Sequence, residues 1–475
     1  MDREVPRLQR DSVPVLAQLG RAPARALTSS VQLTIVAFHR RDPMRSIDAA
    51  TVQRFAWRVM ALLFAGSVVN YIDRAALGVV MPQIRRDLSL SNAAYGFAVN
   101  AFLITYMVFY ILGGHLADRL GCRRMFSLSV VFWSAAKMAH FFARGLGSLC
   151  FFRALLGIGE GCFYPTAIRG TTEWFASDNR AKGIGVLLCG LSVGALLTPP
   201  GIAWIAANFG WRVAFLVTGA TGLLLVPPWL VLHPRVRRLW GTADPVPAGE
   251  SGDRPPAHAG NEPLFGQVLR SRKYLCLLAA RSLTDAAWYF YLFWMPGYFQ
   301  EARGLNIGSV GRLLWIPYLA ADAGALGGAW ASSAFIKREW PLDRARKAVL
   351  LGGALMAAGG AAACKARSAW LALAIISVAL LGHQAWSSNM HTAITEVSPG
   401  RLVALLYGIT GAAGTLVGAI SQPVIGRLVD VYGYMPPFLS AGAAYLAAAT
   451  IVLLAGRIEP IAAPSGAEGA GTGGL

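Results

Sequence analysis

Charged residues are scarce in this sequence: Asp, Glu, Lys and Arg make up 14% of its 475 residues. A soluble globular protein carries about 25%, so the chain lacks the polar groups needed to cover a surface that faces water. This shortage excludes a soluble enzyme, a nucleic-acid-binding protein and a disordered chain. Hydrophobic residues instead make up 55% and gather in blocks nearly free of charge, such as 187–207, 213–232 and 348–364. Blocks of about 20 apolar residues span a bilayer, so the sequence predicts a polytopic membrane protein embedded in lipid.

Cysteine is also rare and shows no paired spacing. The six cysteines are scattered, mostly within apolar blocks, and no two of them form a C-x-x-C motif. Neither a zinc site nor a disulfide framework is therefore indicated. We expect small buried thiols, no metal and no cofactor.

The first residues lack a sustained apolar run, so no cleavable secretory signal is expected. We predict a disordered cytoplasmic tail over 1–55 and a second disordered tail over 457–475. Met44, followed by Arg45 and Ser46, is an alternative start, which leaves open whether residues 1–43 are part of the protein.

The apolar blocks predict an all-α protein with twelve transmembrane helices in two halves, residues 56–233 and 273–456. A Pro- and Gly-rich cytoplasmic linker, 234–272, separates the halves. The predicted spans are 56–80, 95–117, 124–145, 149–172, 181–207, 213–233, 273–299, 309–336, 345–364, 369–394, 403–428 and 434–456.

The basic residues indicate how the chain is oriented. The net charge is +19, and Lys and Arg concentrate in the loops between spans 2–3, 4–5, 6–7, 8–9 and 10–11. Loops rich in Lys and Arg stay on the cytoplasmic side, so both termini are expected in the cytoplasm of a bacterium, with the protein in its inner membrane.

A weak internal repeat supports the division into halves. Pro200, Gly210 and Phe215 have the same spacing as Pro423, Gly433 and Phe438. Repeated halves with a site at their interface are typical of transporters.

Charges within the spans are the strongest indication of function, because an ionised side chain at a helix centre costs about 2.5–3.5 kcal/mol. Asp73 and Arg74 lie in span 1, and Arg153 and Glu160 lie two turns apart on one face of span 4. Two cations could hold an anion while two carboxylates carry protons. The alternative is a set of structural ion pairs between helices.

The loop between spans 2 and 3 reads GHLADRLGCRR and resembles the G-x-L-A-D-R-x-G-[RK]-[RK] signature of the major facilitator superfamily. Cys122 occupies the first terminal basic position and displaces the arginine pair by one residue. The resemblance implies a cytoplasmic gate; setting the topology is the alternative role. The gate residues would be Gly114, Asp118, Arg119, Gly121, Arg123 and Arg124.

A narrower resemblance over about 56–456 is to the anion:cation symporter family, and within it to hexuronate and aldonate transporters. It rests on NYIDR in span 1, R-x6-E in span 4, EWF at 173–175, WRVAF at 211–215, and ARSLTDAAW, ADAG and GHQA in the second half. The resemblance implies anion binding by Arg74 and Arg153, proton coupling by Asp73 and Glu160, and a substrate contact at Tyr106. Leu191 departs from the aldonate transporters, which place a glutamine there.

The second half offers further candidates for substrate contacts. Trp288 belongs to an aromatic band that could stack on a substrate or form an interface belt. His383, Gln384 and Asn389 could bind hydroxyl groups or could bond to other helices instead. Arg281, Asp285 and Asp322 could form a gate or a structural network.

The sequence therefore predicts a monomeric, non-enzymatic secondary transporter that moves a small organic anion with protons by alternating access. A sugar acid is the favoured substrate class, and the proton gradient is the expected driving force. The alternatives are the same fold carrying an aromatic carboxylate, or a membrane sensor that does not transport. Efflux of hydrophobic cations is disfavoured, because paired arginines repel cations.

Overall fold

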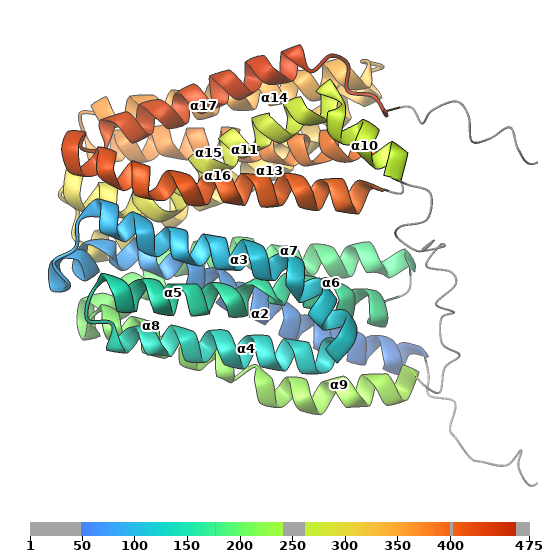
Figure 1. Cartoon of the computed structure of the whole chain (residues 1–475), viewed down its shortest axis with the longest axis horizontal. Helices are drawn as coiled ribbons and strands as arrows, with labels where there is room; N and C mark the ends of the chain where they lie inside the picture. Colours follow the sequence, from blue (N-terminus) through green and yellow to red (C-terminus); the bar gives the residue numbers. More distant parts are fainter. Residues whose placement is uncertain (1–48, 176, 241–261, 400–401, 462–475) are drawn as a thin grey trace, which may run out of the picture. The chain divides into compact units, whose positions relative to one another are not determined.

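A computed structural model describes residues 49–175, 177–240, 262–399 and 402–461 (Figure 1). The alternative start at Met44, the middle of the predicted linker and the C-terminal tail beyond Ile461 lie outside the described residues. So do the side chains of residues 173 and 174, part of the EWF motif.

Every regular element in these ranges is a helix. Figure 1 shows α2–α9 grouped in one half and α11–α17 in the other. The helices of the first half are α2 (Ala49–Asp87), α3 (Asn92–Leu120), α4 (Cys122–Ala139), η1 (His140–Phe142), α5 (Leu146–Gly161), α6 (Phe163–Trp174), α7 (Ser177–Phe209), α8 (Trp211–Leu223) and α9 (Val226–Trp240). Those that follow are α10 (Glu262–Arg270), α11 (Arg272–Gly297), η2 (Tyr298–Ala302), α12 (Ile307–Leu313), α13 (Trp315–Lys337), α14 (Leu342–Ala358), η3 (Gly359–Lys365), α15 (Ala369–Val397), α16 (Val403–Tyr432) and α17 (Met435–Leu454).

The predicted arrangement of twelve membrane helices is confirmed. Within the described ranges, ten helical segments are long and apolar enough by themselves to cross a membrane. The other two crossings are α11 and α13 with the short α12 before it. Arg281 and Asp285 in α11 and Asp322 in α13 lower the hydropathy of these two, and these charges are the ones singled out above.

Two boundaries differ from the predicted ones. α2 begins at Ala49, before the predicted residue 56, because residues 49–55 contain neither Gly nor Pro to end a helix. Helix also extends into both ends of the predicted linker, through α9 as far as Trp240 and through α10.

The internal repeat has a structural counterpart. Gly210 and Gly433 follow α7 and α16, and both adopt a positive φ, 82° and 71°, which a residue without a Cβ adopts at little cost. Phe215 and Phe438, five residues later, are both fully buried. The same turn is therefore built at the same place in each half.

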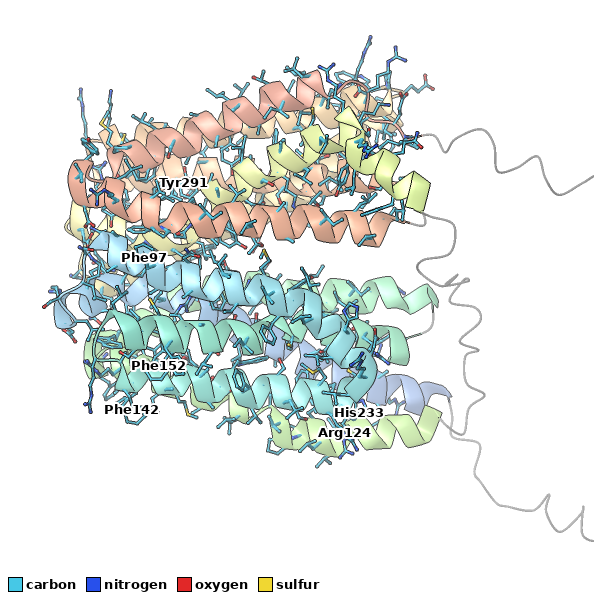
Figure 2. The ribbon with its side chains drawn as sticks, viewed as in Figure 1. Phe97, Arg124, Phe142, Phe152, His233 and Tyr291 are labelled. Carbon is cyan, nitrogen blue, oxygen red and sulfur yellow. The ribbon has the colours of Figure 1, made fainter. Side chains whose placement is uncertain are left out.

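The outer surface is apolar along the helices. Leu326, Trp330 and Leu355 expose 75%, 74% and 66% of their surface. Figure 2 shows the exposed apolar side chain of Phe142 near one end of the bundle and the charged side chain of Arg124 near the other. Large exposed apolar side chains of this kind are stable against lipid tails.

The G-x-x-x-G spacings bring helices close together, as predicted. A Cβ added at Gly157 would overlap the α3 backbone, and one at Gly324 would overlap the Leu381 carbonyl of α15. The same holds for the second glycine of each pair and for the pairs in α7 and α16: Gly161, Gly328, Gly190, Gly194, Gly414 and Gly418.

We expect Gly324→Ala to destabilise the protein by about 1–3 kcal/mol, because the new methyl group would force α13 away from α15. Thermal unfolding in detergent, followed by tryptophan fluorescence, measures the change. Gly327→Ala is the matched control in the same helix, since nothing lies within 4 Å of its added Cβ. Equal melting temperatures for the two variants would contradict this packing role.

The two halves are joined by hydrogen bonds at one end of the bundle, where α2 meets α3 and α16 meets α17. The Arg85 guanidinium donates to Glu301 at 2.6 Å. The backbone N–H groups of Asn92 and Ala93 donate to the two Asp430 oxygens at 2.8 and 2.9 Å. The hydroxyl of Tyr95 donates to the carbonyl of Phe293, at 3.0 Å. These contacts close this end, which lies opposite the ends of α9 and α11 that flank the linker.

Candidate substrate and proton site

Arg74, Tyr106 and Glu160, three residues singled out from the sequence, meet in the first half. Arg74 Nε and Nη2 both lie 3.5 Å from Glu160 Oε2, and Nη2 also lies 3.2 Å from the amide oxygen of Asn70. The Arg74 guanidinium sits 4.3 Å from the centre of the Tyr106 ring. Glu160 is fully buried, whereas 13% of the Arg74 side chain is exposed. Tyr289 of α11 lies near Arg74, so this pair borders the second half.

Arg153 does not pair with Glu160, although both lie on one face of α5. Its side chain is fully buried, and none of its three guanidinium nitrogens has a hydrogen-bond partner among the described residues. The guanidinium instead lies 4.3 Å from the centre of the Phe102 ring. The structural ion pair between Arg153 and Glu160, the alternative considered above, is therefore not formed. A buried cation without acceptors is costly, which makes Arg153 a candidate for binding an anion.

Asp73 pairs with Lys137 of α4, a residue that the sequence analysis missed. Lys137 Nζ lies 3.6 Å from Asp73 Oδ1 and donates to the backbone carbonyl of Asp73 at 2.5 Å. Both side chains are fully buried. The sequence does mark this residue, because Lys137 is a charged side chain within the apolar run of predicted span 3.

In the second half, Trp288 and His383 form one aromatic unit. Their rings are stacked at 4.8 Å with an interplanar angle of 10°. His383 Nδ1 also lies 2.5 Å from the Tyr445 hydroxyl, which ties α15 to α17. The structure therefore brings these two predicted residues together, with His383 held by a second helix.

Asn389 and Gln384, also on α15, differ in how they are engaged. The Asn389 side chain accepts a hydrogen bond from Arg346 at 3.3 Å and donates to the Ala385 carbonyl at 3.0 Å. Arg346 in turn binds Glu396 at 2.8 Å. Asn389 therefore takes part in bonding between helices, the alternative role considered above. Gln384 is half-buried and forms no side-chain hydrogen bond with the described residues.

The three other charged residues singled out in the second half bond to different helices. Arg281 pairs with Asp285 at 3.5 Å and donates to the Thr410 hydroxyl at 2.7 Å, so it joins α11 to α16. Asp322 accepts a hydrogen bond of 2.7 Å from Ser192 of α7 and so links the two halves.

The loop between α3 and α4 folds back on its own half. Asp118 pairs with Arg169 of α6, and both are partly exposed. Gly121 adopts a φ of 77°, and the Arg123 carbonyl accepts a bond from the Trp229 indole at 3.1 Å. Gly114 is half-buried, while Arg119 and Arg124 are exposed. The structure therefore places the arginine that faces Asp118 on α6.

The sequence and the fold both agree with known proteins. The family model described as Major Facilitator Superfamily matches residues 63–421. The chain belongs to this superfamily. Its charged cluster thus lies in a twelve-helix transporter fold rather than in an enzyme.

Two curated relatives within the superfamily align over most of their length. The D-galactonate transporter of Escherichia coli O6:H1 is 27% identical over 426 residues, covering 87% of this chain and 99% of the relative. The hexuronate transporter of Escherichia coli K12 is 26% identical over 394 residues, covering 82% and 90%. The narrower resemblance to hexuronate and aldonate transporters is confirmed.

Solved structures give the same fold. A bacterial homologue of the human lysosomal transporter Spinster, in an inward-facing and unoccupied conformation, superposes with a TM-score of 0.64. It is 21% identical in sequence, and the match covers 84% of this chain and 95% of that one.

Within the described residues, no cluster of three or more His, Cys, Asp or Glu side chains could hold a metal ion.

Proposed function

We propose that this protein is a symporter that imports a sugar acid, a hexuronate or an aldonate, together with protons. One observation carries the proposal: the Arg74–Glu160 pair lies beside a second arginine, Arg153, whose buried guanidinium has no acceptor in the described residues. An anionic substrate would supply that acceptor. The relatives that transport galactonate and hexuronates support a sugar acid as this anion.

Proton uptake and anion binding are linked through Glu160. While Glu160 is ionised it holds Arg74, at 3.5 Å. Once it is protonated, it no longer attracts the guanidinium, so Arg74 is free to bind the substrate carboxylate beside Arg153. Arginine suits this role because its planar group binds a carboxylate through two parallel hydrogen bonds.

Loss of the proton from Glu160 to the cytoplasm drives release of the substrate. When Glu160 loses its proton, it competes with the substrate carboxylate for Arg74 and expels the anion. Binding one proton with one monoanion leaves the net charge of the site unchanged, which lowers the cost of occluding it in a membrane interior. The two halves then move about the central site to alternate its access.

The orientation is part of the proposal. The basic loops favour cytoplasmic termini and insertion in a bacterial inner membrane. The closed end of the bundle, held by Arg85–Glu301 and Asp430, then faces outward. With this orientation, the structure corresponds to the inward-facing conformation of the transporter.

Uptake into proteoliposomes tests the proposed function. We expect labelled glucuronate, galacturonate or galactonate to accumulate when an inward proton gradient is imposed, and to equilibrate only slowly without it. Vesicles that contain the Arg153→Met variant are the matched control. If none of these sugar acids enters vesicles that contain folded protein, the proposed function is wrong.

The stacked Trp288–His383 pair supports a second candidate, an aromatic carboxylate. A parallel ring pair offers a flat face on which an aromatic acid could stack. Labelled benzoate in the same uptake assay separates the two. Uptake of benzoate alone would keep the coupling mechanism and change the substrate class.

A further inference from the structure

Lys137 is a buried cation within the membrane that neither the substrate site nor the proton step proposed above uses. Its side chain is fully buried. Its ammonium group has three neighbours: Asp73 Oδ1 at 3.6 Å, the Asp73 carbonyl at 2.5 Å, and the Phe215 ring, whose centre lies 4.5 Å away. An isolated ammonium in such surroundings is very unfavourable, so Asp73 must supply the compensating charge.

We propose that Lys137 is a resident counter-ion that keeps Asp73 ionised throughout the transport cycle, so that Glu160 alone carries the coupled proton. This inference rests on the proposed symport and deepens it, since the sequence analysis assigned proton coupling to both carboxylates. With Asp73 fixed as an anion, the cycle moves one proton per substrate and not two.

The charges around Asp73 make the pair self-contained. On α2 itself, the neighbouring Arg74 is engaged by Glu160. The α4 helix provides Lys137, and Thr218 of α8 lies near Asp73, while neither carboxylate oxygen of Asp73 accepts a hydrogen bond from the described residues. His140, one turn after Lys137, directs its Nδ1 to the Ala136 carbonyl at 2.8 Å.

From α5, Arg153 and Glu160 also act on Asp73 and Lys137. When Glu160 takes up its proton, the positive charge around Asp73 increases, which favours the ionised form of Asp73 further. Protonation of Glu160 therefore opposes protonation of Asp73.

Replacing both Asp73 and Lys137 tests whether Asp73 only balances the charge of Lys137 or also carries a coupled proton. We expect the Asp73→Asn, Lys137→Met double variant to accumulate substrate as the wild type does. With the membrane potential clamped at zero, one coupled proton gives about tenfold accumulation per pH unit of gradient, and two give about a hundredfold. A double variant that exchanges substrate but no longer accumulates it would show that Asp73 carries a coupled proton, and the proposal would be wrong.

The single variant provides the contrast. Asp73→Asn leaves Lys137 buried and uncompensated, so we expect the yield of folded protein to fall by at least about tenfold, with rescue by the second substitution. Lys337→Met is the matched control, since Lys337 is exposed at the end of α13. Wild-type yield and transport for Asp73→Asn alone would contradict the pairing.

A spectroscopic measurement does not depend on transport. In the Glu160→Gln variant, infrared spectra taken from mildly alkaline to mildly acidic pH should show no carbonyl-stretch band from Asp73 as a protonated carboxyl group. A band that appears on acidification and disappears when Asp73→Asn, Lys137→Met is added would overturn the proposal. Because this readout needs no substrate, it also distinguishes failure of the counter-ion role from failure of the symport itself.

Discussion

Arg153→Met is expected to weaken substrate binding strongly while leaving the folded protein as stable as the wild type, or more so. The guanidinium of Arg153 is fully buried without a hydrogen-bond acceptor in the described residues, so its removal relieves a cost. Met fills much of the same volume and packs against Phe102. Loss of one member of a buried, hydrogen-bonded charge pair weakens binding by about 2–5 kcal/mol, which is at least about 30-fold in affinity.

The combination of readouts is what identifies a binding residue. A structural arginine would lower the melting temperature when replaced, whereas a binding arginine lowers only the affinity. Substrate-induced stabilisation in detergent and uptake in proteoliposomes measure the two effects. Arg212→Met is the control, because Arg212 also lies over a ring, that of Trp211, but is 37% exposed and pairs with Asp87. Strong binding by Arg153→Met would remove Arg153 from the site.

Glu160→Gln should abolish proton-driven accumulation while sparing exchange of substrate across the membrane. Glutamine keeps the size of the side chain but cannot lose a proton, so Arg74 stays free for the anion in both orientations of the site. The expected loss is the whole accumulation ratio, about tenfold per pH unit for one coupled proton. Counterflow of labelled against unlabelled substrate should continue near the wild-type rate.

The control for this variant is a carboxylate outside the membrane helices. Glu459 follows α17, is 55% exposed and binds Lys273 at 2.7 Å. That hydrogen bond lowers the pKa of Glu459, so the group stays ionised as the pH falls until well into the acidic range. Glu459→Gln should accumulate substrate as the wild type does. Accumulation against a gradient by Glu160→Gln would instead assign coupling to another group.

Hydropathy is sufficient to predict the helical architecture, because the thickness of the bilayer fixes the length of a span. All twelve crossings lie close to the predicted ranges. Even the two that fail a hydropathy criterion, α11 and α13, were placed correctly, since their polar residues are few and lie within otherwise apolar runs. The glycine spacings likewise predicted close helix contacts, because a missing Cβ acts locally.

Pairing between helices was less predictable. The spacing of Arg153 and Glu160 places them on one face of α5, but it does not say which partner from another helix each one meets. Glu160 meets Arg74, and Arg153 meets an aromatic ring. The sequence marks Lys137 as a charge within a span, but it does not show that the partner is Asp73, 64 residues away. For Asn389 the sequence leaves open a substrate contact and a bond to another helix, and the bond from Arg346 depends on the register of two helices.

Proton movement driven by the substrate itself would test proton coupling most directly. Wild-type protein is reconstituted in vesicles that carry a pH-sensitive dye inside, with no imposed pH gradient, and the sugar acid that gave uptake is added outside. We expect the lumen to acidify when the substrate is added, and we expect no acidification in vesicles that contain Glu160→Gln. Entry of labelled substrate with no change in lumenal pH would contradict proton coupling and leave a carrier that only equilibrates its substrate.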